Sequence, residues 1–142
     1  MFKIFDISGS GMTAQRLRMD TIANNLANAE TTRTQEGTPY RRQTVILQAN
    51  QNQNFASVLK DKQKPIGAGV KVTQIAEDSS PFKQVYNPSH PDADENGYVS
   101  YPNVDAVTEM VNMISASRSY EANAQSVNVA KDMFLKALNI GN

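Results

Sequence analysis

The residues with the clearest potential for chemistry lie between positions 92 and 100. Their spacing matches the first nine positions of an EF-hand calcium loop, with carboxylates at positions 1 and 3, an amide at 5 and a glycine at 6: Asp92, Asp94, Asn96 and Gly97. Carboxylate and amide oxygens are the ligands that Ca²⁺ prefers. The pattern therefore raises the hypothesis of a calcium-responsive binding module built on the Asp92–Asn103 loop.

Two features of the surrounding sequence argue against a complete calcium site. The position of the bidentate Glu that closes an EF-hand loop is held by Asn103, and Pro88 and Pro91 stand where the preceding helix should be. A turn that uses Asp side chains and the Asn96-Gly97 pair before a strand explains the same letters. We therefore expect no metal here, and the calcium module remains the alternative hypothesis.

The sequence contains no convincing catalytic constellation. His90 is the only histidine, and its neighbours in a Pro-rich loop do not have the spacing of a metal site. There is no Cys, which excludes thiol catalysis and cysteine-ligated metals. No GxSxG elbow, GxGxxG motif or P-loop occurs. We expect a protein that is not an enzyme and that has no cofactor.

Composition narrows the class of protein further. The 142 residues suffice for one domain, and the formal net charge of zero lacks the basic surplus of a nucleic-acid binder. No stretch approaches the roughly 18 apolar residues of a membrane span. The first six residues contain no apolar core of a conventional signal peptide, so we expect another route if the protein is exported.

The positioning elements begin with a helix that the spacing predicts over residues 4–30. Residues that are mostly apolar recur there at alternating intervals of three and four, which is a heptad seam with two polar members: Phe5, Ser8, Met12, Gln15, Met19, Ile22, Leu26 and Ala29. The middle of the chain reads differently. We expect short strands at 41–48, 69–73 and around Val99 and Tyr101, and the prolines make a regular helix improbable from 79 to 103.

A second helix is predicted over residues 104–138, with Asn103 as its N-cap. Its apolar stripe consists of Val104, Val107, Val111, Ile114, Tyr120, Ala124, Val127, Ala130 and Phe134. Small polar residues and Arg118 interrupt this stripe at residues 115–119. The back faces of the two helices are also partly apolar, at Leu17, Met110, Met113 and Met133 among others, and such faces need further partners.

These elements predict a mainly α fold with a small β-rich insertion. The long N- and C-terminal helices should pack as an antiparallel coiled coil. We expect an N-terminal helix in residues 1–32, a middle β and loop insertion in 33–103 and a C-terminal helix in 104–142. Residues 1–32 and 104–142 would then form one discontinuous helical domain.

Several motifs resemble the axial proteins of the bacterial flagellar rod and hook. Near the N-terminus these are Ser10-Gly11-Met12 and the run Ile22-Ala23-Asn24-Asn25-Leu26-Ala27-Asn28-Ala29-Glu30-Thr31; near the C-terminus they are Val104-Asp105 and Tyr120-Glu121-Ala122-Asn123. The length, the stretch His90–Asp94 and the run Tyr101-Pro102-Asn103-Val104 are most similar to the proximal rod subunits of that family. Another short rod subunit is the structural alternative.

The resemblance implies a structural subunit of the proximal rod, the drive shaft that carries torque across the periplasm, assembled through its terminal helices. It also implies export through the flagellar type III apparatus without a cleaved signal. The implied partners are rod subunits of the FlgB, FlgF and FlgG types, copies of this chain, and a FliE-type adaptor with the motor ring. Neither nucleic acid nor insertion in a membrane is expected.

Apolar seams and amides on the two helices are the expected contacts between subunits. An Asn is costly in an isolated helix, but in a packed tube it can bond a neighbour and fix register. The predicted interface residues are Met12, Met19, Ile22, Asn24, Asn25, Leu26, Asn28, Val107, Val111, Ile114, Tyr120, Val127 and Phe134.

Overall fold

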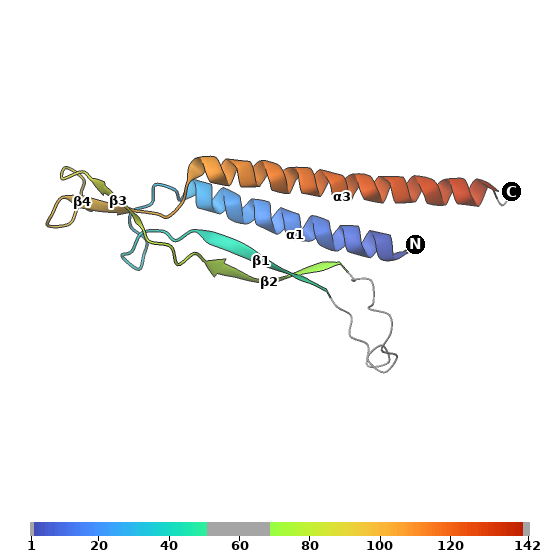
Figure 1. The fold of residues 1–142 in the computed structure, drawn as a ribbon, viewed down its shortest axis with the longest axis horizontal. Coiled ribbons are helices and arrows are strands. Elements are labelled where there is room, and N and C mark those ends of the chain that lie inside the picture. The colour runs from blue at the N-terminus through green and yellow to red at the C-terminus, as the bar shows by residue number, and fades with distance from the viewer. Residues whose placement is uncertain (1, 51–68, 141–142) are drawn as a thin grey trace, which may run out of the picture.

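The computed structural model describes residues 2–50 and 69–140 and shows an elongated molecule (Figure 1). Two long helices lie side by side, and two small antiparallel sheets lie beside and beyond them. The elements in chain order are α1 (Phe2–Ala27), β1 (Gln43–Ala49), β2 (Val70–Glu77), β3 (Lys83–Tyr86), β4 (Tyr98–Tyr101) and α3 (Ala106–Ile140). Neither of these helices carries an apolar stretch long enough to cross a lipid bilayer. The expectation of a mainly helical chain with a small β-rich insertion is confirmed.

Helices α1 and α3 run antiparallel, and two contacts define their register. Gly11 faces Asn123, and Asn25 bonds to Glu109, so fourteen residues along α1 match fourteen along α3. At this register Phe2 is level with Asp132. The last residues of α3, from 133 to 140, therefore extend past the start of α1, as Figure 1 shows.

The apolar stripe expected on α3 does not form a single face. The buried residues of α3 are Glu109, Ala116 and Ala130, whereas Val107 is 70% exposed and Ile114 is 56% exposed. The cause is the interruption at residues 115–119. The six steps from Ile114 to Tyr120 turn a helix by about 600°, roughly 120° short of two turns, so the stripe changes faces there.

Both inner helix ends differ from their predicted positions for local reasons. Helix α1 ends at Ala27, because the Asn28 side-chain amide bonds to the carbonyl of Asn24 at 2.9 Å and a turn follows. Helix α3 begins at Ala106, and its cap is Asp105, whose carboxylate accepts from the Thr108 amide at 2.7 Å. The assignment of Asn103 as the N-cap was wrong.

The hydrogen bonds that the Asp105 carboxylate accepts, chiefly from Thr108, lower the pKa of Asp105 below 3.8.

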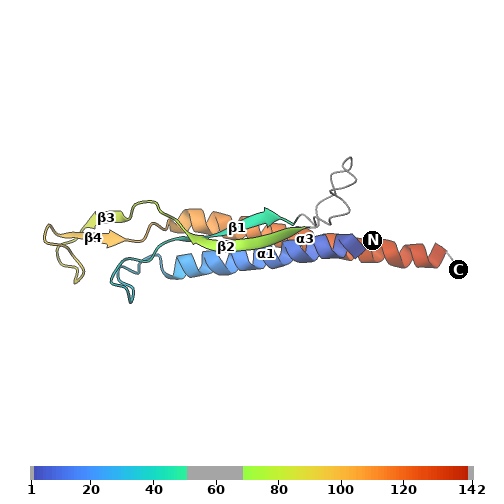
Figure 2. The ribbon, with the colours of Figure 1, turned by 90° about the horizontal axis from the view of Figure 1, so that it is seen from below.

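Strands β1 and β2 form a two-stranded ribbon along α1, which Figure 2 shows from below. The register runs from Gln43 opposite Glu77 to Ala49 opposite Val70, with a bulge between Ile46 and Leu47. Both strands were predicted, although β2 continues to Glu77 rather than ending at residue 73.

One end of the ribbon rests directly on α1. Gly69 has a positive φ of 96° and approaches the backbone of Ile7 and the side chain of Ser10. The Ser10 hydroxyl accepts from the Val70 amide at 3.1 Å and donates to the Ile7 carbonyl at 2.8 Å. A side chain at position 69 would not fit, so glycine is required by both its conformation and the space available.

The second hairpin pairs β3 with β4, from Lys83 opposite Tyr101 to Tyr86 opposite Tyr98. Strand β4 was expected, but β3 was not, because a four-residue strand after Pro81 has little local signal. The rings of Tyr86 and Tyr98 meet edge to face at 5.4 Å. Thr32 donates to Asp92 at 2.8 Å and ties this hairpin to the loop that follows α1.

Candidate functional site

The calcium-like loop is a turn that uses its own carboxylates. Asp94 Oδ1 accepts from the backbone amides of Asn96 and Tyr98, at 2.9 and 2.8 Å. Gly97 supplies the positive φ of 81° that the turn needs. Among residues 2–50 and 69–140, no group of three or more His, Cys, Asp or Glu side chains could hold a metal ion. The calcium alternative has no support here.

His90 has a structural role in the same loop. Its Nδ1 accepts from the Asp92 amide at 3.1 Å. Its ring meets the ring of Tyr101 edge to face, with centroids 6.3 Å apart. These contacts stabilise the turn between β3 and β4.

The most organised polar site lies where α1, β1 and α3 meet. We call Asn25, Tyr40, Arg42 and Glu109 the polar junction. Asn25 and Glu109 are fully buried, and they come from opposite ends of the chain. Buried polar groups are costly unless they are hydrogen-bonded, so the bonds of each member matter.

Asn25 uses both ends of its amide within the junction. Its Nδ2 donates to the Gln43 carbonyl at 2.8 Å and to Glu109 Oε2 at 3.0 Å. Its Oδ1 accepts from the Gln43 amide at 2.8 Å and from the Tyr40 hydroxyl at 2.9 Å. The side chain therefore pairs with the backbone of β1 as a neighbouring strand would, while it also holds α3.

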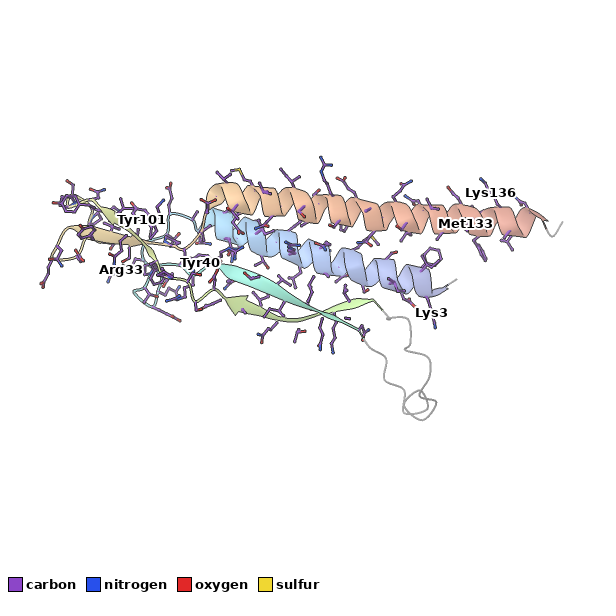
Figure 3. The ribbon with its side chains drawn as sticks, in the orientation of Figure 1. Lys3, Arg33, Tyr40, Tyr101, Met133 and Lys136 are labelled. Carbon is purple, nitrogen blue, oxygen red and sulfur yellow. The ribbon has the colours of Figure 1, made fainter. Side chains whose placement is uncertain are left out.

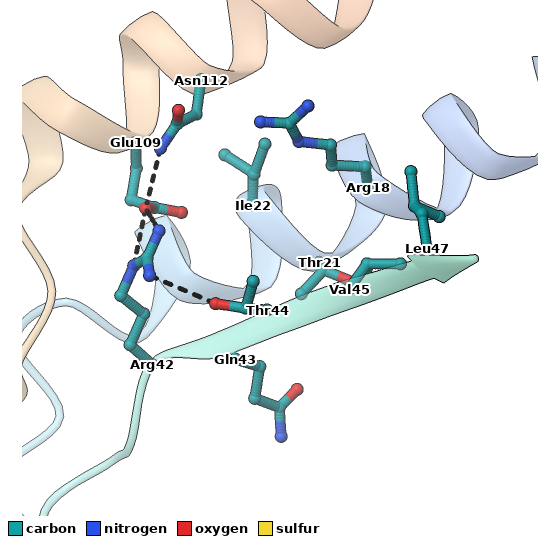
Figure 4. A pocket seen from close by; sticks show the side chains of 10 residues that line it. All are labelled: Arg18, Thr21, Ile22, Arg42, Gln43, Thr44, Val45, Leu47, Glu109 and Asn112. Carbon is teal, nitrogen blue, oxygen red and sulfur yellow. Dashed lines mark hydrogen bonds and ion pairs between the residues drawn. The ribbon is translucent and has the colours of Figure 1, made fainter. Parts of the chain in front are cut away.

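Glu109 is neutralised by Arg42. Nε and Nη2 of Arg42 donate to Glu109 Oε1 at 2.9 and 2.8 Å, and Nη1 reaches Thr44 at 3.2 Å (Figure 4). A carboxylate without exposure to water needs such a partner, because an unpaired buried charge is strongly unfavourable. The pair thus joins the start of the insertion to the first turn of α3.

Asn103 and Asp78 hold Arg42 in place. The Arg42 amide donates to Asn103 Oδ1 at 2.9 Å, and Arg42 Nη1 reaches Asp78 Oδ2 at 3.4 Å. Asn103 also donates to the carbonyls of Asp78 and Ser80. The hydroxyl and amide of Ser80, followed by the charge of Arg42, lower the pKa of Asp78 below 3.8. Asn103 thus braces the junction instead of capping a helix.

The Tyr40 hydroxyl titrates abnormally because of this environment. Burial is the main cause that raises its pKa above 10.0, and the negative charges of Glu109 and Glu77 add to it. Tyr40 therefore remains a hydrogen-bond donor to Asn25 at neutral pH.

A small pocket of about 170 Å³ opens beside the junction. Figure 4 shows that Arg18 from α1 and Asn112 from α3 lie on either side of it, with Thr44 and Leu47 of β1 at its other wall. It is a gap between three elements, and its wall is shared with the junction.

The predicted interface residues fall into three groups. Asn25 and Ile22 are buried within the chain; Met12, Met19, Leu26, Asn28 and Val127 are half-buried; Asn24, Val107, Val111, Ile114, Tyr120 and Phe134 are exposed. The structure brings together Asn24, Asn25 and Asn28 near Tyr40 through a chain of hydrogen bonds. It does not unite the apolar residues of α3 on one face.

Two exposed apolar patches on α3 follow from this arrangement. The outer patch consists of Val107, Met110, Val111 and Ile114, each at least 52% exposed. The C-terminal patch consists of Met133, Phe134, Leu135 and Leu138, each at least 43% exposed. Figure 3 shows the second of these at Met133, near Lys136 and past Lys3 of α1.

Tyr40, Arg42 and Glu109 were not identified as functional from the sequence. Arg41-Arg42 read as a short basic pair, and Glu109 as one charged residue in a helix. No local pattern distinguishes them, because Arg42 and Glu109 lie 67 residues apart in the chain and the partner of Tyr40 lies 15 residues away.

Paired terminal helices, a small β-rich insertion and apolar patches exposed on α3 are features of a structural protein. Comparison with known families agrees with this class. Residues 5–34 match the family described as "Flagella basal body rod protein", and residues 95–140 match "Flagellar basal body rod FlgEFG protein C-terminal".

The particular family follows from three similar proteins of known identity. The chain is 47% identical to the flagellar basal-body rod protein FlgC of Bacillus subtilis (strain 168) and to that of Borreliella burgdorferi, over 99% of this chain and 97% of each relative. It is 45% identical to FlgC of Escherichia coli O157:H7, over 99% of this chain and 98% of the relative. The chain belongs to the FlgC family of flagellar basal-body rod proteins, and it is a structural rod subunit.

Proposed function

We propose that this subunit builds the proximal rod, which carries torque across the periplasm, and that it assembles through its terminal helices. The observation that carries the proposal is the exposure of the outer and C-terminal patches on α3. Contiguous exposed apolar side chains of this kind mark interaction sites. Burying a half-exposed side chain of this size stabilises an assembly by about 1 kcal/mol.

The two patches lie at opposite ends of one helix, so a single subunit can contact different neighbours through each. An interface that is not self-complementary produces a ring where its rotation closes and an open helical assembly where it does not. We propose that the other predicted interface residues contribute beside them. Met12, Met19 and Leu26 on α1 would contribute with Tyr120 and Val127 on α3, in coiled-coil fashion, and Asn24 and Asn28 through their amides.

Asn25 has a different place in the proposal. Its amide makes four hydrogen bonds inside the chain. We therefore assign it to positioning the two helices that form the interface, and not to bonding a neighbouring subunit directly.

The proposal includes the domain organisation and the partners. Residues 1–32 and 104–142 form one discontinuous helical domain, and residues 33–103 are inserted into it. The partners are copies of this chain, FlgB-, FlgF- and FlgG-type subunits, and a FliE-type adaptor with the motor ring. Export proceeds through the type III apparatus without a cleaved signal peptide.

The test compares two substitutions to aspartate on the exposed side of α3. Ile114→Asp places a charge in the outer patch, and Gln125→Asp places the same charge on an exposed residue outside it. Each variant is expressed in a flagellated bacterium whose own FlgC gene has been deleted, so that swimming depends on the variant. Swimming in soft agar, the rods of isolated basal bodies and secreted subunit are measured.

Ile114→Asp should abolish swimming and rod assembly while secretion continues, because its side chain is exposed in the folded subunit and the change does not disturb the chain itself. Gln125→Asp should swim normally. Unimpaired swimming of Ile114→Asp, with circular dichroism showing equal helix in both variants, would contradict the proposal.

A further inference from the structure

The contact between α1 and α3 contains few features that fix how far one helix slides along the other. The buried apolar residues of the two helices are Ala14, Ala116 and Ala130, with Ile22 as the one large side chain, and Gly11 lies against Asn123. Helices pack by fitting the ridges of one into the grooves of the other, and small side chains form only low ridges. Something else must select the observed register.

The polar junction supplies a contact that only one register satisfies. Glu109 on α3 is completely buried and receives Asn25 at 3.0 Å from α1 and Arg42 at 2.8 Å from the insertion. Arg42 is also tied to the ribbon, because it directly precedes β1 and its guanidinium reaches Asp78, the residue after β2, at 3.4 Å.

A slide of one helical turn moves α3 by about 5.4 Å. That distance breaks every hydrogen bond from Asn25 and Arg42 to Glu109, since such bonds require donor and acceptor within about 3.2 Å. The carboxylate would then be buried without its partners, which is strongly unfavourable, whereas the small apolar contacts could re-form one turn away.

We propose that Asn25, Arg42 and Glu109 act as a register lock that sets the axial position of α3 against α1. Buried ionic groups often contribute little net stability compared with apolar side chains of similar size. One polar residue in an otherwise apolar helix seam can nevertheless specify register. The lock acts within one subunit, and it does not depend on how subunits contact each other.

The chain contains no cysteine, so engineered pairs report register without interference. A Cβ at Gly11 would lie 3.2 Å from Cγ of Asn123, which places cysteines at these two positions within disulfide reach. This is the native pair. Gly11→Cys with Ser119→Cys, and Gly11→Cys with Val127→Cys, report displacement by about one turn in either direction.

Each pair is placed in the full-length chain, oxidised at low protein concentration, and scored as the fraction of monomer that is cross-linked on a non-reducing gel. In a chain that is otherwise wild type, the native pair should cross-link in a much larger fraction of molecules than either shifted pair. The lock is then replaced by apolar residues of similar size: Asn25→Leu, Arg42→Met and Glu109→Leu together.

With the lock removed, the shifted pairs should gain at least tenfold in cross-linked fraction, and the native pair should lose a corresponding share, while helix content by circular dichroism is retained. Glu109→Gln is the matched control. Its amide oxygen can still accept from Arg42, so it should keep the native pair dominant.

Native-only cross-linking in the folded triple variant would overturn the proposal. If the triple variant loses its helices, Asn25→Leu with Glu109→Leu is measured next, since Arg42 keeps its contact with Asp78 there. Native-only cross-linking in that second variant overturns the proposal equally. Loss of helix in both variants also overturns the proposal, because the register lock would then be required for folding and not for the choice of register.

Discussion

Arg42 and Glu109 are separated by 67 residues, yet Nε and Nη2 of the arginine both donate to the same carboxylate oxygen, at 2.9 and 2.8 Å. The glutamate is 1% exposed and the arginine 24% exposed at their side chains. This contact joins the insertion to the C-terminal helix. Through Asn25, it joins both to the N-terminal helix.

Removing only the carboxylate should therefore be costly. In Glu109→Ala, the guanidinium and the Asn25 amide lose their shared acceptor in a region largely closed to water. We expect the free energy of unfolding to fall by about 2–3 kcal/mol, below the upper values for fully buried pairs because Arg42 retains some contact with solvent. Urea unfolding followed by circular dichroism measures this difference.

Glu121→Ala provides the control, since it makes the same change on an exposed residue of the same helix. It should alter the free energy of unfolding by no more than about 0.5 kcal/mol. Equal effects of the two substitutions would show that the buried ion pair is not a significant source of stability.

Alkaline pH should weaken the fold through Tyr40. Its pKa is raised above 10.0 in the folded chain, mainly by burial. The folded state therefore keeps a proton that the unfolded state loses, so this contribution is fully present below pH 10 and is lost as pH rises through the folded pKa. The slope of stability against pH above about 10 should be shallower in Tyr40→Phe.

At neutral pH, Tyr40→Phe should cost about 1 kcal/mol, because Asn25 Oδ1 loses one of its two donors. Tyr86→Phe removes a hydroxyl from a ring that is 64% exposed. It should change neither the free energy of unfolding at neutral pH nor the slope of stability against alkaline pH. A Tyr40→Phe protein with the wild-type alkaline slope would disprove the role assigned to this hydroxyl.

Gly69 should tolerate no side chain. It combines a φ of 96° with close approach to Ile7 and Ser10, so Gly69→Ala is expected to lower the free energy of unfolding by about 3 kcal/mol through strain and overpacking. Gly37→Ala is a matched control, with a φ of 79° and nothing within 4 Å of the added methyl group. It should cost about 1 kcal/mol, from backbone strain alone.

The contact with Ser10 can be separated from the strain at Gly69 itself. Ser10→Ala combined with Gly69→Ala removes the hydroxyl that the new methyl group would meet. Part of the loss should be restored in thermal unfolding, and the ribbon should pack on α1 again. A double variant that is less stable than Gly69→Ala would refute this explanation of the close contact.

Local patterns in the sequence determined the secondary structure well. The heptad spacing from Phe5 to Ala29 predicted α1, the β-branched pair Val45-Ile46 predicted β1, and alternation of apolar and polar residues predicted β2, because these signals lie within a few residues of the chain. Asn28 and Asp105 moved the helix ends by two or three residues, since a side chain that bonds the local backbone outweighs a weak propensity.

The sequence by itself therefore determined every one of the described elements except β3, that the terminal helices are long and apolar in part, and, through its motifs, the family. Only the tertiary structure decided which faces those helices bury: Val107 and Ile114 are exposed, whereas Asn25 and Glu109 are buried. The physical reason is that burial depends on neighbours brought from 84 residues away, and a hydrogen bond over that separation leaves no periodic trace near either residue.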